Sequence, residues 1–304
     1  MHQALAQPCS PHYSKIYSRH AYKGLYLVGN CVASISYRCL AVQEQLREIM
    51  PALAQPLTPP RLAYAVLEPY RLFSDITHMV FRHPLINNIS NGDGHTVMVL
   101  PGFLGNDSST TALRHYINRW GYDAQPWELG RNLGPRRGST DIEALLRDRL
   151  DTLYKQSGQK VSLVGWSLGG VLSRELARSC PAKVRQVISL GSPYGGDPKK
   201  STSIWRLFER VTELPLDGEL MQSLLERSRQ PVKKVPCTSI YSRSDGIVSW
   251  QVAREKPGRL SENIRVKASH IGLGFSPSVM VAIADRLAQD PKNWQPMSQR
   301  IADF

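Results

Sequence analysis

The chain has 304 residues, of which 41% are hydrophobic and 21% are charged, a composition typical of a globular protein with one large core. Collagen-like and wholly disordered chains are excluded, and the lack of any run of about 18 apolar residues excludes a polytopic membrane protein. The net charge of +13 favours anionic surroundings such as acidic lipid headgroups, but the basic clusters are too short to predict a nucleic-acid site.

The cysteines and the first residues of the chain predict the compartment. An odd number of cysteines without a CxxC motif is typical of reduced thiols; the five are Cys9, Cys31, Cys39, Cys180 and Cys237. The first residues lack a basic stretch followed by an apolar one, so no secretory signal is recognised. We therefore expect a cytoplasmic protein, which would lie at a membrane surface if its N-terminal region binds lipid.

Residues 1–90 predict a tail followed by a helical hairpin. In Gly24–Met50, apolar residues recur at alternating steps of four and three, which predicts a helix with one apolar face. After a proline-rich break at 51–60 the rhythm returns, and Pro69 should kink or end the second helix midway. The second apolar series is Leu62, Val66, Pro69, Phe73, Ile76 and Val80. Such a hairpin could dock on the main domain, pair with a second copy, or lie on a lipid surface.

Residues 91–304 alternate apolar runs with helical segments, the pattern of a mainly parallel α/β sheet. Several runs are apolar throughout, as expected for strands buried on both faces. The expected strands are His95–Leu100, Tyr122–Trp127, Lys160–Gly165, Val184–Leu190, Val235–Tyr241 and Asn263–Lys267. The expected helices are Thr110–Trp120, Asp141–Gln156, Leu168–Arg178 and Ser278–Gln289.

The stretch from Val161 to Gly170 reads strand, Gly-x-Ser-x-Gly, helix, which predicts a nucleophile elbow with Ser167 at its tip. A serine nucleophile needs a base and an acid that orients the base, in the chain order serine, acid, histidine. His270 is the only histidine after Ser167, and it follows the last expected strand. Asp245 follows the preceding strand and is the expected acid, with Asp197 as the alternative.

An oxyanion hole needs two backbone N–H donors. We expect one at Leu168, directly after the nucleophile, and the other in the Pro-Gly-Phe-Leu-Gly loop after the first strand. Phe103 is the favoured donor in that loop, and Leu104 is the alternative.

These motifs, together with Gly-Ser-Pro-Tyr-Gly-Gly at 191–196, resemble the α/β-hydrolase superfamily and within it bacterial lipase/esterase-like serine hydrolases. The resemblance covers about residues 91–304 and implies an α/β-hydrolase fold with a helical lid insertion. It says little about substrate, because the superfamily also contains transferases, thioesterases and peptidases. Pro101 and Trp166 stand where many lipases have histidine, and residues 1–90 match no family pattern.

The lid is expected at about 199–234, with two amphipathic faces that either cover an acyl pocket and move or simply form a helix pair over the sheet. The two faces are Ile204, Leu207, Phe208, Val211 and Leu220, Met221, Leu224, Leu225. The candidate substrate contacts are Leu104, Arg131, Asn132, Trp166, Tyr194 and Trp250; Arg131 and Asn132 could instead brace the oxyanion loop.

The sequence thus predicts a serine hydrolase that cleaves lipid-like acyl esters and requires no metal or organic cofactor. One alternative is an acyltransferase or thioesterase that uses acyl-CoA or another anionic carrier. Another is a lipid-surface scaffold whose triad is vestigial. The expected partners are a small acyl ester or lipid and, if the N-terminal hairpin binds lipid, a membrane surface, with no nucleic acid; the oligomeric state is not predicted.

Overall fold

The computed structural model describes residues 57–87, 92–136, 141–290 and 293–297. The chain divides into two compact units after Gln55, and every described residue belongs to the second unit. The first helix of the expected hairpin, Gly24–Met50, lies outside the described residues.

Six parallel strands form the centre of this unit, in the order β2-β1-β3-β4-β5-β6. They are β1 (Thr96–Leu100), β2 (Asp123–Pro126), β3 (Val161–Trp166), β4 (Val184–Leu190), β5 (Cys237–Ser242) and β6 (Ser261–Val266). Strands β1, β3 and β5 are buried along their whole length, as the continuous apolar run at 97–100 predicted for β1. Because all strands are parallel, the loops that follow them meet at one edge of the sheet.

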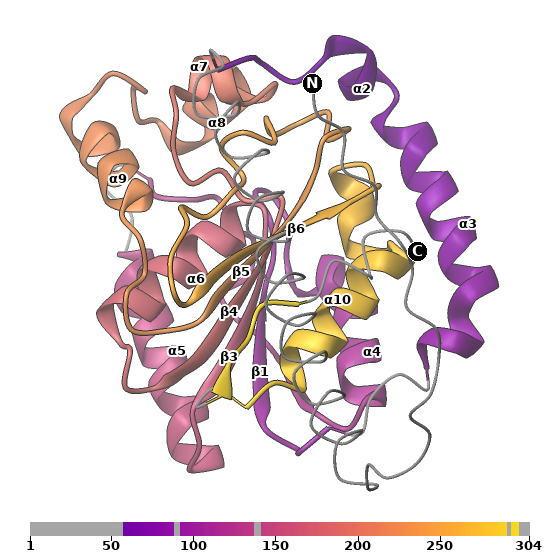
Figure 1. Ribbon diagram of the computed structural model, residues 1–304. Helices are drawn as coiled ribbons and strands as arrows, with labels where there is room; N and C mark the ends of the chain where they lie inside the picture. The colour runs from indigo at the N-terminus through magenta and orange to yellow at the C-terminus, as the bar shows by residue number, and fades with distance from the viewer. Residues whose placement is uncertain (1–56, 88–91, 137–140, 291–292, 298–304) are drawn as a thin grey trace, which may run out of the picture. The chain divides into compact units, whose positions relative to one another are not determined.

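Helices cover both faces of the sheet (Figure 1). On one face lie α4 (Thr111–Arg119) and α10 (Pro277–Leu287), and on the other α5 (Ile142–Ser157) and α6 (Leu168–Ser179). Alternate residues of β1 point to the two layers: Val97 and Val99 pack with α4 and α10, while Met98 and Leu100 pack with α5 and α6. The predicted parallel sheet flanked by helices is confirmed, and the element ends differ from the expected ones by at most two residues.

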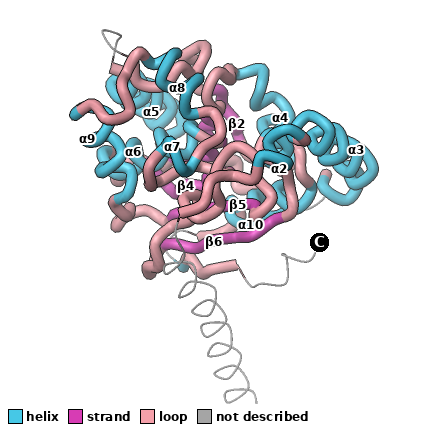
Figure 2. The backbone as a smooth tube through the Cα atoms, turned by 90° about the horizontal axis from the view of Figure 1, so that it is seen from above, coloured by secondary structure: helices cyan, strands magenta, loops and turns pink. Residues whose placement is uncertain are grey.

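Three short helices stand between β4 and β5, where the lid is expected. They are α7 (Pro198–Ser201), α8 (Trp205–Thr212) and α9 (Glu219–Arg229). Figure 2 shows them on the side of α5 and α6, away from α3. Leu214, Leu216 and Met221 form a small core of their own, with Trp205, Phe208 and Leu225 packed against it.

Two helices precede the sheet, α2 (Leu62–Val66) and α3 (Glu68–Ile86). Pro69 lies in the first turn of α3, so it separates two helices, as expected. Met79 and Ile86 of α3 enter the core beside α4 and α10, and Trp120 Nε1 donates a 2.7 Å hydrogen bond to the Ile86 carbonyl. Helix α3 is therefore part of the same compact unit as the sheet.

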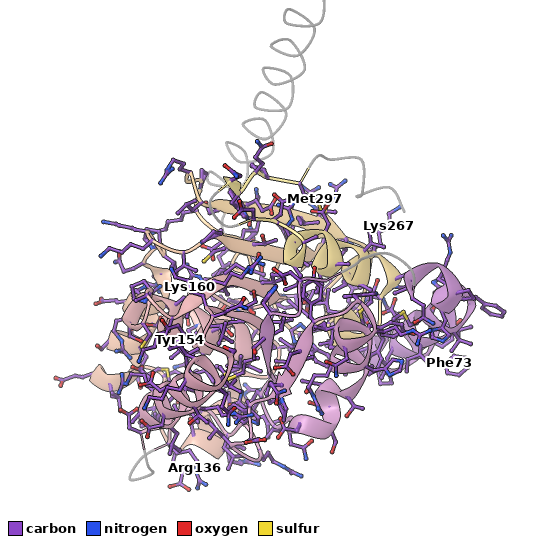
Figure 3. All side chains as sticks on the ribbon, turned by 90° about the horizontal axis from the view of Figure 1, so that it is seen from below. Phe73, Arg136, Tyr154, Lys160, Lys267 and Met297 are labelled. Carbon is purple, nitrogen blue, oxygen red and sulfur yellow. The ribbon has the colours of Figure 1, made fainter. Side chains whose placement is uncertain are left out.

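The apolar series predicted for this segment faces solvent. Leu62 is 77% exposed, Phe73 69% and Val80 67%, and Figure 3 shows Phe73 projecting from the edge of the molecule. The opposite side of α3 carries Glu68, which is buried, and Asp75. None of the described helices has both the length and the apolar character needed to cross a membrane.

Candidate active site

Ser167 occupies a sharp turn between β3 and α6. Its backbone has φ 53° and ψ −119°, a combination that residues other than glycine rarely adopt. The Ser167 N–H donates to the Leu190 carbonyl at 2.8 Å, and the Ser167 carbonyl accepts from the Gly170 N–H at 3.0 Å. These two bonds hold the strained residue between β4 and the first turn of α6.

Gly165 and Gly169 of the motif are required because other backbone atoms lie too close to them for a side chain. A Cβ at Gly165 would lie 2.5 Å from backbone atoms of Gly169 and Gly170. A Cβ at Gly169 would lie 2.5 Å from the Leu100 carbonyl oxygen at the end of β1. No side chain fits in either place, so the spacing predicted from the sequence has a steric cause.

His270 and Asp245 form a buried pair beyond the ends of β6 and β5. His270 Nδ1 lies 2.6 Å from Asp245 Oδ2, and each residue is 5% exposed. The other carboxylate oxygen, Asp245 Oδ1, accepts the N–H groups of Ile247 at 2.8 Å and Val248 at 2.7 Å. An Nδ1–H of His270 that donates to Asp245 leaves Nε2 available as a base.

The surroundings of His270 favour its protonated form. Burial alone would lower the pKa of the imidazole, but the negative charge and hydrogen bond of Asp245, with a further contribution from Glu68, raise it above its usual value. A base with a raised pKa accepts a proton more readily.

The loop after β1 lies beside Ser167. A Cβ at Gly102 would lie 3.3 Å from the Ser167 Cβ. The Leu104 N–H donates to the Asn132 carbonyl at 2.7 Å, whereas the Phe103 N–H has no acceptor among the described residues. The Leu168 N–H is the first of α6 and has no intrahelical partner. Phe103 and Leu168 therefore offer the two free N–H donors, and Leu104 does not.

A parallel sheet, a strained serine between β3 and α6, and an acid and a histidine that follow later strands in the order serine, aspartate, histidine together define a known architecture. The chain has the α/β-hydrolase fold. No protein-family model and no curated protein matches the sequence.

Solved α/β hydrolases are similar to this chain in structure. A monoacylglycerol lipase from Paleococcus ferrophilus is 18% identical, with a TM-score of 0.46 over 63% of this chain and 93% of that one. A lipase from Bacillus licheniformis is 21% identical, with a TM-score of 0.48 over 63% and 91%. A 2-hydroxy-6-oxo-6-phenylhexa-2,4-dienoate hydrolase from a Rhodococcus strain is 12% identical, with a TM-score of 0.48 over 65% and 92%.

Beside Ser167 the unit has an apolar cavity of about 150 Å³, which the lid helices cover. Its lining includes Ser167 and Leu168, and the charged residues Glu143, Glu175 and Arg227. Its apolar lining includes Phe103, Val171, Leu172, Ile204, Phe208, Met221, Leu224 and Leu225. Five of the predicted lid residues thus face the cavity, whereas Leu207 and Leu220 are exposed to solvent.

A salt bridge links the lid to the body of the unit. Arg227 Nη2 of α9 lies 2.5 Å from Glu143 Oε1 at the start of α5. Both residues line the cavity, so the pair joins the lid to α5 beside it.

Asn132 braces the loop after β1. It is fully buried, its Nδ2 donates to the Pro101 carbonyl at 2.8 Å, and its Oδ1 accepts the Gly134 N–H at 3.1 Å. Its backbone pairs with Leu104 and Gly105 at 2.7 and 2.8 Å. Of the two roles that the sequence left open for Asn132, the structure places it in bracing; its neighbour Arg131 is exposed and does not line the cavity.

The other candidate contacts lie away from the cavity. Trp166 Nε1 donates to the His270 carbonyl at 3.2 Å, so this ring supports the histidine loop. Tyr194 is buried under the Arg174 guanidinium, which lies 4.0 Å from the ring centroid. Trp250 stacks on Tyr241. Asp197, the alternative acid, instead caps α7 by accepting the Lys199 N–H.

Three residues of α3 that the sequence analysis missed contact the loops of Asp245 and His270: Glu68, Arg71 and Asp75. They recur at steps of three and four and therefore share one face of α3. The sequence signal for them is this charged face, opposite the apolar face from which the helix was predicted. No group of three or more His, Cys, Asp or Glu side chains in the described ranges is arranged to hold a metal ion.

Proposed function

We propose that the protein is a serine hydrolase that cleaves carboxylic esters of lipid-like acyl chains. The observation that carries the proposal is the convergence, at one edge of the sheet, of a strained serine, a hydrogen-bonded aspartate–histidine pair and two N–H donors beside an apolar cavity. Each component has a defined part in acyl transfer.

In the proposed reaction Ser167 Oγ attacks the ester carbonyl while His270 Nε2 removes its proton. The Phe103 and Leu168 N–H groups stabilise the oxyanion, and the Asp245 carboxylate stabilises the imidazolium that forms. His270 then gives the proton to the leaving alcohol, and water attacks the acyl-enzyme by the same steps. Among the described residues no hydrogen bond joins Ser167 to His270, and the proposed reaction requires this bond to form when the substrate binds.

The cavity supports an apolar acyl group. Its wall is formed by aliphatic and aromatic side chains, which favour burial of methylene groups at about 0.8 kcal/mol each. The charged residues that line the cavity are two carboxylates and one guanidinium, and Arg227 is already paired with Glu143. Because the described residues of this lining offer no unpaired positive charge, they favour an ester with a neutral leaving group over a phosphate-bearing acyl carrier.

A chain-length series tests the substrate class. p-Nitrophenyl esters from acetate to palmitate, and matched acyl-CoA thioesters, would be assayed with wild type and with Ser167→Ala. We expect higher kcat/KM for medium or long esters than for acetate, with the activity lost in the variant. Turnover of thioesters alone, or transfer to an alcohol in preference to water, would contradict ester hydrolysis and support the carrier-dependent alternative.

We also propose an anionic phospholipid surface as the partner of α2 and α3. The exposed side of these helices carries Leu62, Phe73 and Phe81. Its exposed charged side chains include Arg61 and Arg82, and neither acidic residue of the two helices is exposed. An apolar face flanked by positive charge is suited to the interface of an anionic bilayer.

Vesicle flotation tests this partner. We expect wild type to bind phosphatidylserine-containing vesicles more strongly than neutral ones, and Phe73→Ser with Phe81→Ser to weaken binding. As a matched control, Leu207→Ser and Leu220→Ser remove exposed apolar side chains from the lid. Equal binding by both double variants, or a concentration-dependent dimer without vesicle binding, would contradict the proposal.

A further inference from the structure

The carboxylate of Glu68 connects the two loops that carry the proposed acid and base. Glu68 Oε1 accepts the Gly246 N–H at 2.9 Å and the His270 N–H at 3.0 Å. Glu68 Oε2 accepts the Ile271 N–H at 3.0 Å. Glu68 is 3% exposed, so these three hydrogen bonds are shielded from water.

The two loops belong to different strands, and the sequence separates them by more than 20 residues. Gly246 follows Asp245 directly, and the His270 loop leaves β6. A single buried carboxylate that accepts from both loops fixes their relative position. Their relative position in turn sets the 2.6 Å contact between Asp245 and His270.

Helices α2 and α3 both contact these loops closely, α2 through its backbone and α3 through the Asp75 side chain. A Cβ at Gly246 would lie 2.5 Å from the Tyr64 carbonyl carbon and 2.6 Å from the Ala65 nitrogen. A Cβ at Gly272 would clash with the Asp75 carboxylate. The absence of a side chain at Gly246 and Gly272 therefore lets α2 and α3 reach the catalytic loops.

The charged groups that face this region come from helix α3 and from the loop after β5. From α3, Arg71 lies 3.7 Å from Glu68 Oε1 and donates to the Ser244 hydroxyl at 2.8 Å. Also from α3, Asp75 accepts the N–H and hydroxyl of Ser269 at 3.1 and 2.8 Å. Asp245 after β5 faces His270 itself. Of these carboxylates, Asp245 and Glu68 raise the pKa of His270.

We propose that Glu68 is a positioning residue of the active site, which holds the Asp245 and His270 loops in register and stabilises the imidazolium by its charge. This inference rests on the proposed function of Ser167, His270 and Asp245. It makes an element from the N-terminal segment, outside the region that resembles hydrolases, a necessary part of the catalytic machinery.

Two substitutions separate geometry from charge. Glu68→Gln keeps an oxygen acceptor for Gly246 and His270 and removes the negative charge, whereas Glu68→Ala removes both. Asp75→Asn is the matched control. Asp75 lies on the same helix and bonds the same histidine loop through Ser269, but it accepts no hydrogen bond from His270 or Gly246.

The variants would be compared with wild type in the full-length protein by pH profiles of kcat and kcat/KM on one ester, and by thermal unfolding. Proton NMR would follow the His270 ring, assigned from the spectrum of His270→Asn. With Glu68→Gln we expect the acid limb of kcat/KM and the NMR titration both to move to lower pH. With Glu68→Ala we expect kcat to fall about 10- to 100-fold with little change in KM, since loss of alignment acts on the chemical step.

The outcomes distinguish this inference from the proposed function. If the Glu68 variants and Asp75→Asn lose similar thermal stability but keep the wild-type acid limb, His270 titration and kcat, then Glu68 is merely structural and the inference is wrong. If wild type shows no esterase activity while Glu68→Gln still shifts the His270 titration, the electrostatic link stands and the proposed function fails.

Discussion

Asn132 allows a quantitative test of how the oxyanion loop is held. Asn132→Leu nearly preserves the volume of this fully buried side chain and removes its hydrogen bonds to the Pro101 carbonyl and the Gly134 N–H. Leaving a buried carbonyl unpaired costs about 1–3 kcal/mol, and the half-buried Gly134 N–H adds about 0.5–1 kcal/mol. The sum predicts a loss of about 2–4 kcal/mol in the free energy of unfolding.

For a unit of this size such a loss lowers the melting temperature by roughly 5–15 °C. Pro101 lies two residues before Phe103, so we also expect the oxyanion donor to shift. Loss of one such donor lowers kcat about 10²–10³-fold, and a displaced donor should lower kcat by about 10- to 100-fold with KM nearly unchanged.

Calorimetry and steady-state kinetics on one ester would measure both effects. Arg131→Ala is the matched control, because Arg131 is the exposed neighbour and does not line the cavity. If Asn132→Leu has the melting temperature and kcat of Arg131→Ala, the bracing role assigned to Asn132 is wrong.

Three further predictions concern the cavity, the histidine and the elbow. Leu224→Trp should fill part of the apolar cavity and lower kcat/KM for long esters more than for acetate; an unchanged chain-length series would exclude this cavity as the acyl site. Burial lowers the pKa of His270, but Asp245 outweighs this effect and the pKa is raised. The acid limb of kcat/KM should therefore lie above pH 6.5. Asp245→Asn should lower kcat about 10⁴-fold. The raised folded-state pKa also means that the contribution of His270 to stability is full below about pH 6.5 and is lost as pH rises through the folded value, as unfolding at several pH values would show. Gly169→Ala would place a Cβ 2.5 Å from the Leu100 carbonyl, so we expect little folded protein; a soluble variant of wild-type stability would contradict the steric account.

The sheet and the elbow could be predicted from sequence because local chemistry specifies them. An apolar run such as 97–100 indicates a strand buried on both faces, and Gly165 is required by the backbone of Gly169 and Gly170, only a few residues away. Asp245 and His270 were then assigned from the chain order serine, acid, histidine that accompanies a nucleophile elbow, and the structure brings Asp245 and His270 together.

The orientation of α3 could not be predicted in this way. Its apolar rhythm favours burial of Phe73 and Val80, yet these residues are exposed, and Glu68 and Asp75 face inward. The reason is tertiary: the loops after β5 and β6 present unpaired backbone N–H groups that only acceptors on a neighbouring element can satisfy. Periodicity within one helix carries no information about such donors.

The candidate substrate contacts were inferred from their place after a strand, which fixes the edge of the sheet but not the direction of a side chain. Asn132 and Trp166 reach that edge and support the Pro101 and His270 loops. The predicted lid faces agree with the structure more closely than the predicted substrate contacts do. Phe208 and Met221 lie on amphipathic helices, whose apolar side packs inward, and both side chains line the cavity.

The central claim is that Ser167 is a nucleophile activated by His270. The direct measurement is labelling with a fluorophosphonate probe, followed by peptide mass spectrometry, in wild type, Ser167→Ala and His270→Gln. The account predicts one label per chain on the peptide that contains Ser167, none in Ser167→Ala, and labelling of His270→Gln slowed by several orders of magnitude. A folded wild type that is not labelled, or is labelled at another serine, would contradict it.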